Sequence, residues 1–244
     1  MTEPAAGRLR LVGTPIGNLA DLSPRAAESL RVADLIACED TRRTRALLTA
    51  HGISGKELVA LHGHNEHAQA ERVVARLLGG ATVALVSDAG MPTVSDPGQH
   101  LVAAASAAGV VVEVVPGPSA ALAALAISGL PTDRFCFEGF LPRKGRDRRD
   151  RLDVMRTEER TAVLFEAPHR LRETLADLVE VCGSDRPIAV ARELTKLYEE
   201  TWRGTVGAAV ARWTDVEPRR EFVIVAGGAE PAGHAEKGAL EAAL

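Results

Sequence analysis

The first half of the chain alternates short aliphatic runs with longer amphipathic stretches, and this alternation constrains the fold more than any other feature. The strand-like runs lie at residues 8–14, 35–38, 58–61, 82–87 and 110–115. Helices are predicted from Ser23-Pro24 onward and over residues 41–51, 66–78 and 98–108. Strands that alternate with helices pair in parallel, because each helix returns the chain to the starting edge of the sheet. The pattern predicts a mostly parallel, doubly wound sheet in which residues 110–115 form a buried strand.

The segment Pro116-Gly117-Pro118 interrupts this pattern. Proline restricts its own backbone and that of the preceding residue, so the segment is predicted to be a rigid connector. We place a domain boundary here, between an N-terminal α/β domain of residues 1–116 and a C-terminal α/β domain of residues 117–228. The Ala-, Gly- and Glu-rich residues 229–244 are expected to form a flexible tail.

The second half of the chain spaces its strand-like runs less regularly. Helices are predicted over residues 119–128, 143–156, 170–181 and 205–213. Strands are predicted over residues 135–139, 161–166, 187–192, 199–203 and 221–226. The uneven spacing favours a mixed sheet. The predicted fold class is therefore α/β, with two α/β domains.

The composition excludes several classes of protein. The net charge of −4 and the pI near 6.0 exclude a uniformly basic nucleic-acid binder. The 3 cysteines include no CxxC pair, which argues against a disulfide framework and a zinc knuckle and favours a reducing compartment. No apolar run approaches the ~20 residues of a membrane span, and the N-terminus lacks an apolar signal core. We expect a cytoplasmic protein that does not insert into membranes.

The loop of residues 87–98 directly follows a strand-like run and carries aspartates, glycines and hydroxyl side chains. Ligands of open α/β sheets bind beyond the carboxyl ends of the strands. Asp88 and Asp96 are suited either to ligand contacts or to capping helices and turns. Loops of this length without secondary structure are usually functional or disordered. The sequence therefore predicts that this loop forms part of a small-ligand site.

Two other strand ends carry candidate site residues. Thr14-Pro15-Ile16-Gly17-Asn18 offers a rigid surface with few side chains, suited to a ligand or simply to a tight turn. It is not a GxGxxG motif, so a dinucleotide site is only weakly indicated. Glu39 and Asp40 open a helix, where acidic side chains suit the helix dipole. The arginines that follow exceed what capping requires and suit phosphate contacts: Arg42, Arg43 and Arg45.

His62, His64 and His67 form an H-x-H-x2-H pattern that resembles a metal site. No cysteine or further histidine lies nearby in the sequence to complete such a site. A polar loop that faces the substrate is the favoured interpretation, and no metal is predicted.

Residues 143–151, hereafter the basic segment, carry six basic and two acidic side chains and a local charge of +4. One interpretation is a solvated helix face with i,i+3 and i,i+4 ion pairs. In a chain that is acidic overall, the asymmetry favours a polyanionic partner whose phosphates release counterions on binding. The candidate RNA contacts are Arg143, Lys144, Arg146, Arg148 and Arg149.

Glu166 and His169 follow another strand-like run and are candidate acid–base residues, because histidine titrates near neutrality. His169 is equally suited to a structural cap before the next helix. The chain contains no GxSxG, Walker A or HExxH motif. Their absence disfavours an α/β-hydrolase, a P-loop NTPase and a zincin.

Taken in order, these motifs resemble those of the ribosomal RNA small subunit methyltransferase I family, one of the tetrapyrrole methylase-like (class III) S-adenosylmethionine methyltransferases. The resemblance runs from about residue 8 to residue 226. The matching segments are Thr14-Pro15-Ile16-Gly17-Asn18-Leu19, Glu39-Asp40-Thr41-Arg42, Leu61-His62-Gly63-His64-Asn65-Glu66, Ser87-Asp88-Ala89-Gly90, Ser95-Asp96-Pro97-Gly98, Pro116-Gly117-Pro118-Ser119-Ala120, Gly129-Leu130-Pro131-Thr132-Asp133-Arg134-Phe135, Glu166-Ala167-Pro168-His169-Arg170 and Arg192-Glu193-Leu194-Thr195-Lys196.

The resemblance implies 2′-O-methylation of a cytidine ribose in the decoding region of 16S ribosomal RNA, with S-adenosylmethionine as cofactor. It implies a cofactor cleft between the two domains, a homodimer, and the small ribosomal subunit as partner. The residues implied to contact the cofactor are Pro15, Ser87, Asp88, Ala89, Gly90, Val94, Ser119, Ala120, Phe165 and Leu194. Glu166, His169 and Glu39 are the candidate bases for the hydroxyl proton, and their ranking stays open.

The sequence departs from the family pattern in three places. Met91 stands where threonine is frequent, a change that leaves backbone contacts intact. Arg220 stands before the last strand where glycine is common, which puts a close backbone approach there in doubt. Many members carry a small C-terminal helical domain, and here only a short tail follows residue 228, so we expect no role of such a domain in RNA capture.

Two other functions stay open at this point. C-methylation of a tetrapyrrole is known within the superfamily, but it has no use for the basic segment. A non-catalytic ribosome-binding factor would use the basic segment but needs no cofactor.

Overall fold

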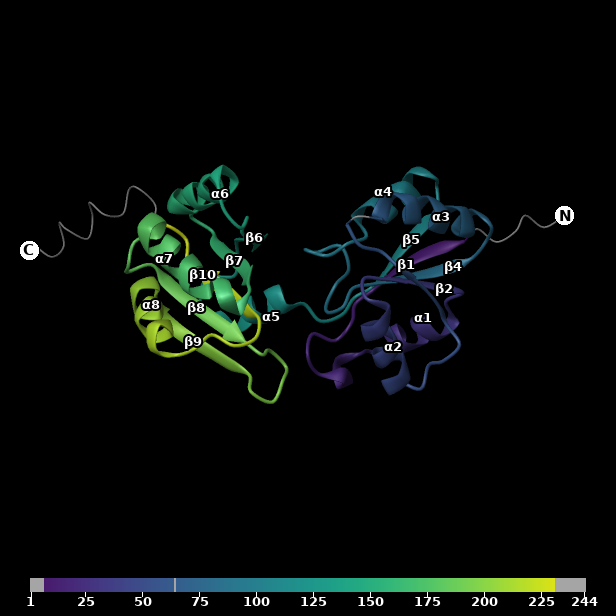
Figure 1. Ribbon diagram of the computed structural model, residues 1–244, viewed down its shortest axis with the longest axis horizontal. Coiled ribbons are helices and arrows are strands. Elements are labelled where there is room, and N and C mark those ends of the chain that lie inside the picture. Colours follow the sequence, from purple (N-terminus) through teal and green to yellow (C-terminus); the bar gives the residue numbers. More distant parts are fainter. Residues whose placement is uncertain (1–6, 64, 231–244) are drawn as a thin grey trace, which may run out of the picture. The chain divides into compact units, whose positions relative to one another are not determined.

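The computed structural model describes residues 7–63 and 65–230; residues 1–6, His64 and residues 231–244, which include most of the predicted tail, lie outside the described residues. The chain divides into two compact units, the first ending at Ser119 and the second beginning at Ala120. Each unit is built around its own sheet (Figure 1).

The sheet of the first unit is parallel throughout its described strands. These strands are β1 (Arg8–Val12), β2 (Leu35–Cys38), β3 (Glu57–Ala60), β4 (Thr82–Val86) and β5 (Val111–Val115). They lie in the order β3-β2-β4-β1-β5, and every neighbouring pair is parallel. The prediction of a mostly parallel, doubly wound sheet is confirmed.

Helices cover both faces of this sheet (Figure 1). They are α1 (Pro24–Val32), α2 (Thr41–Ala50), α3 (Glu66–Leu78) and α4 (Gln99–Ala107), with a short 3-10 turn η1 (Leu19–Asp21). Successive side chains of a strand point to opposite faces. In β2, Leu35 and Ala37 accordingly pack with residues of α3 and α4, whereas Ile36 and Cys38 pack with residues of α1 and α2. This double burial explains why the strands read as continuous apolar runs.

The prediction that residues 110–115 form a buried strand is wrong in one respect. β5 forms, but it pairs with β1 alone and lies at the edge of the sheet. As a result Val111 is 50% and Val114 56% exposed. Glu113 of the same strand forms ion pairs with Arg8 and Arg10 of β1 at 2.9 and 2.8 Å. A run of valines predicts a strand, but it does not specify how many neighbours cover it.

The sheet of the second unit is mixed, as predicted. Its described strands are β6 (Phe135–Phe140), β7 (Thr161–Glu166), β8 (Pro187–Arg192), β9 (Glu200–Thr205) and β10 (Phe222–Ala226). Their order is β6-β7-β10-β8-β9. β6 and β7 are parallel, and the other neighbouring pairs are antiparallel.

The helices of the second unit are unevenly divided between the two faces of its sheet (Figure 1). They are α5 (Ala120–Ser128), α6 (Arg146–Thr157), α7 (Leu171–Cys182) and α8 (Val206–Asp215), with a 3-10 turn η2 (Pro168–Arg170) before α7. Residues of α6, α7 and α8 share one apolar core with β7, β8 and β10. α5 packs against the sheet through Ala121, Ala124 and Leu125, which are buried.

The highly charged helix begins later than the predicted residue 143. α6 starts at Arg146, after Gly145, whose φ of 86° lies in the left-handed region. Arg143 and Lys144 therefore belong to the loop between β6 and α6. A glycine with positive φ typically interrupts a helix, and this one separates the first two cations of the basic segment from the rest.

Candidate functional site

In the first unit, the strand ends of β1 and β4 are joined by a backbone pair. The amide of Thr14 donates to the carbonyl of Gly90 at 2.9 Å, and the amide of Gly90 donates to the carbonyl of Thr14 at 3.1 Å. The hydroxyl of Thr14 also donates to the carbonyl of Ser87 at 3.2 Å. The structure thus brings the loop of Pro15 against the segment that contains Asp88 and Ala89, as a shared site requires.

A third loop joins them through glycine contacts. The amide of Gly13 donates to the carbonyl of Val115 at 3.0 Å. A Cβ atom on Gly13 would lie 2.6 Å from Cα of Gly117, closer than real Cβ atoms come to a neighbour. The connector of residues 116–118 therefore packs backbone to backbone against the end of β1. Sequence reasoning missed Gly13, because nothing local marks its contact with a loop about a hundred residues away.

The rest of the loop at residues 87–98 has a strained backbone. Thr93 and Ser95 have φ values of 75° and 64°, in the region that favours glycine. Val94, a predicted cofactor residue, lies between them with 44% of its surface exposed. The loop ends at Gly98, whose amide donates to Oε1 of the buried Glu66 at 2.9 Å. Strained segments of this kind persist only where the surroundings fix them, and they cluster at functional sites.

Carboxylates converge at the ends of β2 and β4. The amide of Asp40 donates to Oδ1 of Asp88 at 3.0 Å, and the amide of Asp88 donates to Oε2 of Glu39 at 3.4 Å. Burial raises the pKa of the Glu39 carboxyl, and the nearby charge of Asp88 raises it further. A hydrogen bond from the Arg42 guanidinium lowers the pKa of Asp40 to about 2. Glu39 and Asp40 are adjacent in sequence, but their pKa values shift in opposite directions.

The arginines predicted to contact phosphates begin α2 beside these carboxylates. Arg42 forms an ion pair with Asp40 at 2.9 Å, and Arg43 forms one with Asp88 at 3.3 Å. Their side chains are nonetheless 87% and 69% exposed. Arg45 is exposed as well. All three cations are open to a ligand on this side of the first unit.

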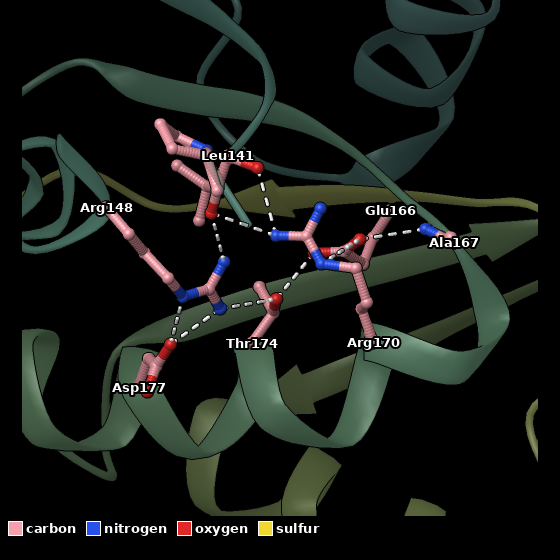
Figure 2. Close-up of polar contacts among 8 residues, drawn as sticks. Leu141, Arg148, Glu166, Ala167, Arg170, Thr174 and Asp177 are labelled. Atoms are coloured by element: carbon pink, nitrogen blue, oxygen red, sulfur yellow. Dashed lines mark hydrogen bonds and ion pairs between the residues drawn. The ribbon is translucent and has the colours of Figure 1, made fainter. Parts of the chain in front are cut away.

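In the second unit, the candidate base Glu166 is enclosed. It is 1% exposed, and its Oε2 accepts a hydrogen bond from the Thr174 hydroxyl at 2.5 Å (Figure 2). Its Oε1 accepts from the amide of Ala167 at 2.8 Å and lies 3.7 Å from Nε of Arg170. These contacts occupy the carboxylate within the second unit. His169, the neighbouring candidate, is exposed in η2.

The other predicted cofactor residues of this half lie on three elements. Phe165, near the end of β7, stacks edge-to-face on Phe137 and Phe140 with centroid distances of 5.0 and 5.5 Å. Leu194 is 7% exposed and lies between two residues with positive φ in the loop between β8 and β9. Ala120 is the first residue of α5 and follows Ser119.

The basic segment faces solvent with one exception. Arg143, Lys144, Arg146 and Arg149 are exposed. Arg148, a predicted RNA contact, is instead buried: its side chain is 6% exposed and donates to Asp177 at 2.6 Å and to Thr174 at 3.0 Å. The helical spacing in the sequence could have indicated this burial. Arg148, Leu152 and Met155 are four and three residues apart, and they share the buried face of α6.

The histidines of the H-x-H-x2-H pattern are only partly described. His64 lies outside the described residues, and His67 stacks on His100 with a centroid distance of 4.0 Å. Across residues 7–63 and 65–230, no group of three or more His, Cys, Asp or Glu side chains is arranged to hold a metal ion. Nor does this part of the chain contain a helix long and apolar enough to cross a membrane.

The sequence similarity to known proteins extends over both units of the chain. The family described as Tetrapyrrole (Corrin/Porphyrin) Methylases matches residues 8–210. A Synechocystis protein named ribosomal RNA small subunit methyltransferase I is 51% identical over 92% of this chain and 80% of its own length. Proteins of the same name from Xylella fastidiosa and Thermotoga maritima are 53% and 46% identical, over 91% and 92% of this chain and 82% and 100% of their own lengths. The chain belongs to the ribosomal RNA small subunit methyltransferase I family of tetrapyrrole methylases.

Solved structures of other proteins share the fold. A uroporphyrin-III-C-methyltransferase from Thermus thermophilus is 25% identical, with a TM-score of 0.61 over 91% of this chain and 94% of that chain. A diphthine synthase, 17% identical, has a TM-score of 0.69 over 90% of both chains. The predicted family and fold class are confirmed, and the chain is a methyltransferase by family.

Two departures from the methyltransferase I pattern have structural counterparts. Arg220 has a φ of 68°, a conformation that glycine adopts without strain, so the glycine common in the family fits the backbone here. A Cβ atom added to Gly13 would lie 2.8 Å from the sulfur of Met91. Met91 thus packs on the backbone at the end of β1.

Proposed function

We propose that this protein methylates the 2′-oxygen of a cytidine ribose in the decoding region of 16S ribosomal RNA, with S-adenosylmethionine as the methyl donor. The observation that carries this proposal is its 51% identity, over 92% of the chain, to a protein named ribosomal RNA small subunit methyltransferase I. Similarity at this level over both units favours a shared reaction as well as a shared fold.

The strand ends of the first unit fit the cofactor. The loops of Pro15, Gly90 and Gly117 pack through backbone, with Pro15 and Gly90 buried, and the exposed Ala89 beside them presents a surface with only a small side chain. A ligand can approach such a surface closely, and Asp88 offers a carboxylate for hydroxyl or amino groups. Val94 adds an exposed apolar side chain. The cofactor supplies an activated methyl group, and these residues supply binding and orientation.

Glu39 is the candidate base that the geometry favours. It lies at a strand end beside Asp88, is only partly buried, and has a raised pKa. A carboxylate whose pKa is raised is a better proton acceptor than an ordinary one. Glu166 is 1% exposed and enclosed by Thr174 and Arg170, which argues against it as the base. His169 stays the alternative.

Exposed cations supply the RNA contacts in this proposal. They come from α2 and from the basic segment, and they are Arg42, Arg43, Arg45, Arg143, Lys144, Arg146 and Arg149. Contacts from such side chains to phosphates position an RNA and read little of its sequence. The choice of one cytidine therefore depends on the shape of the small ribosomal subunit around it. We also propose that the enzyme acts in the cytoplasm as a homodimer, which sedimentation velocity tests.

The decisive experiment is transfer of a tritiated methyl group to small-subunit particles that lack this modification, followed by mapping of the labelled nucleotide. Label at a cytidine 2′-oxygen in the decoding region is the expected result, and fully modified particles are the control. Absence of S-adenosylmethionine binding in calorimetry would instead indicate a non-catalytic ribosome-binding factor. Label on a tetrapyrrole and none on RNA would indicate C-methylation.

A further inference from the structure

Two largely buried arginines of the second unit hold the loop that precedes α6. Nη1 of Arg148 and Nη2 of Arg170 both donate to the carbonyl of Pro142, each at 3.1 Å. Nη2 of Arg170 also donates to the carbonyl of Leu141 at 2.9 Å (Figure 2). One guanidinium comes from α6 and the other from η2, so the loop is held from both sides.

The two arginines are linked and neutralised by three side chains. Nε and Nη2 of Arg148 donate to Asp177 at 2.8 and 2.6 Å. The hydroxyl of Thr174 accepts from Arg148 and donates to Glu166, which pairs with Arg170. Two cations thus face two anions, with Thr174 between them, which is the condition for keeping charges inside a protein.

This arrangement does more than fasten α6 to α7. Apolar residues such as Leu152, Met155 and Leu175 already pack these helices together in one core. Apolar side chains at the arginine positions would serve packing alone without the cost of burying charge. The guanidinium groups instead reach the loop carbonyls directly before Arg143 and Lys144.

Leu141 is 2% exposed and anchors the start of the loop in the apolar core, but the residues after Pro142 have few other restraints. Gly145, which precedes α6, has no side chain to cap the helix and adopts a positive φ. Arg143, Lys144 and Arg149 are exposed, and none of them forms an ion pair with the rest of the chain that the structure describes. The position of these cations therefore depends on the carbonyls held by Arg148 and Arg170.

We infer that Arg148 and Arg170 are positioning residues that fix the loop of residues 141–145 so that the exposed cations of the basic segment can bind RNA phosphates. Glu166 orients Arg170 in this arrangement and is not the base. The inference rests on the proposed function, because it assigns RNA as the ligand of the basic segment.

The test compares Arg170→Lys with Ile188→Val, a core substitution in β8 that lowers stability without touching the loop. Lysine keeps the charge, but its single ammonium group cannot donate to the loop carbonyls, as Nη2 does, and also face Glu166, as Nε does. We expect Arg170→Lys to raise the dissociation constant for a small-subunit RNA fragment by about tenfold, which corresponds to one fewer charge-assisted hydrogen bond. The KM for small-subunit particles should rise more than kcat falls, and S-adenosylmethionine affinity should not change. Ile188→Val should leave RNA affinity unchanged.

Two further measurements separate the possible failures. The triple variant Arg143→Ala, Lys144→Ala, Arg149→Ala should weaken RNA binding and lower its salt dependence by about one unit of slope for each phosphate that is no longer neutralised. If it does so and Arg170→Lys binds RNA like the wild type, the positioning role is wrong and the RNA-binding role of the basic segment stands. If the triple variant binds RNA like the wild type, the basic segment does not bind RNA and the inference is overturned. The proposed methyl transfer is then still tested separately, by the labelling experiment. Should Arg170→Lys fail to fold, Thr174→Val breaks the link between the arginines and is judged by the same outcomes.

Discussion

Asp88 accepts a hydrogen bond from the backbone amide of Asp40 at 3.0 Å, and this contact ties the end of β4 to the start of α2. The same carboxylate lies close to Glu39 and is the largest charge that raises its pKa, after burial itself. Asp88 is itself engaged by the amide of Asp40 and by the guanidinium of Arg43, which lies 3.3 Å away. The strand end therefore holds Glu39, whose pKa is raised, beside a carboxylate that is held by two partners.

The first prediction concerns Glu39 and the pH dependence of stability. The pKa of Glu39 is higher in the folded than in the unfolded protein, so the folded state binds more protons between the two values. The free energy of unfolding then falls as pH rises through this interval. We expect Glu39→Gln to be more stable than the wild type at neutral pH, and this difference to vanish below the ordinary glutamate pKa of 4.5. Urea denaturation across pH measures it.

Glu71→Gln, at an exposed position of α3, is the matched control and should show no such pH-dependent difference. A Glu39→Gln protein that is less stable than the wild type at neutral pH would mean that the hydrogen bond from the Asp88 amide outweighs burial.

The second prediction concerns Asp40, whose pKa shifts in the opposite direction to that of Glu39. Asp40 has a pKa of about 2 in the folded protein, lowered from 3.8 chiefly by Arg42. Its contribution to stability is present above 3.8 and is lost as pH falls toward 2. Asparagine caps a helix as well as aspartate does, so Asp40→Asn removes only the charge. Between these pH values the wild type should lose stability relative to Asp40→Asn, as thermal melts can show; parallel curves would contradict the shift.

The third prediction addresses the backbone contact between Gly13 and Gly117. A methyl group on Gly13 would meet backbone 2.6 Å away, so Gly13→Ala must push the two loops apart. Overpacking of this kind costs about 1–3 kcal/mol, and the variant should also bind S-adenosylmethionine more weakly. Gly63→Ala is the control, because nothing lies within 4 Å of its added methyl group. Denaturation and calorimetry measure both effects, and equal behaviour of the two variants would contradict the prediction.

Local patterns in the sequence predict the elements of this fold well. The β2, α3, β7 and β8 boundaries agree with the predicted residues 35–38, 66–78, 161–166 and 187–192. Glycine, proline and capping residues mark such ends, and these signals are local. Ser23 illustrates the point, since its hydroxyl accepts from the amide of Ala26 and caps α1 as expected.

Properties that depend on distant parts of the chain are not predictable in this way. The burial of Arg148 requires Asp177, and the enclosure of Glu166 requires Thr174. Exposure of Val114 follows from the position of β5 in the sheet, which the strand's own residues do not encode. The residue types at a candidate site can thus be chosen from sequence, but which of them face a ligand depends on tertiary contacts.

The fourth prediction concerns Arg220, whose φ of 68° is unfavourable for any residue with a Cβ atom. The left-handed conformation costs such a residue about 1–2 kcal/mol, whereas glycine loses about 0.5–1 kcal/mol more backbone entropy on folding. We expect Arg220→Gly to raise the free energy of unfolding by up to about 1 kcal/mol. Arg219→Gly, at the neighbouring position without positive φ, should lower it. Chemical denaturation distinguishes the two, and a destabilised Arg220→Gly would show that the arginine makes a compensating contact.

The last prediction identifies the proton acceptor by single-turnover methyl transfer. If Glu39 is the base, Glu39→Gln should slow the transfer by about 10²–10⁴-fold, while S-adenosylmethionine affinity changes little. The rate of the wild type should rise with pH through the raised pKa of Glu39, because only the ionised carboxylate accepts a proton. In that case His169→Ala, which removes an exposed side chain of the second unit, should keep most of the rate. A normal rate for Glu39→Gln together with a slow His169→Ala would transfer the role of base to His169.

Glu166→Gln tests the remaining candidate base. Its buried amide can still accept a hydrogen bond from Thr174, so the loop should stay in place. A large loss of methyl-transfer rate with unchanged RNA affinity would contradict both the enclosure of Glu166 and its assignment to loop positioning.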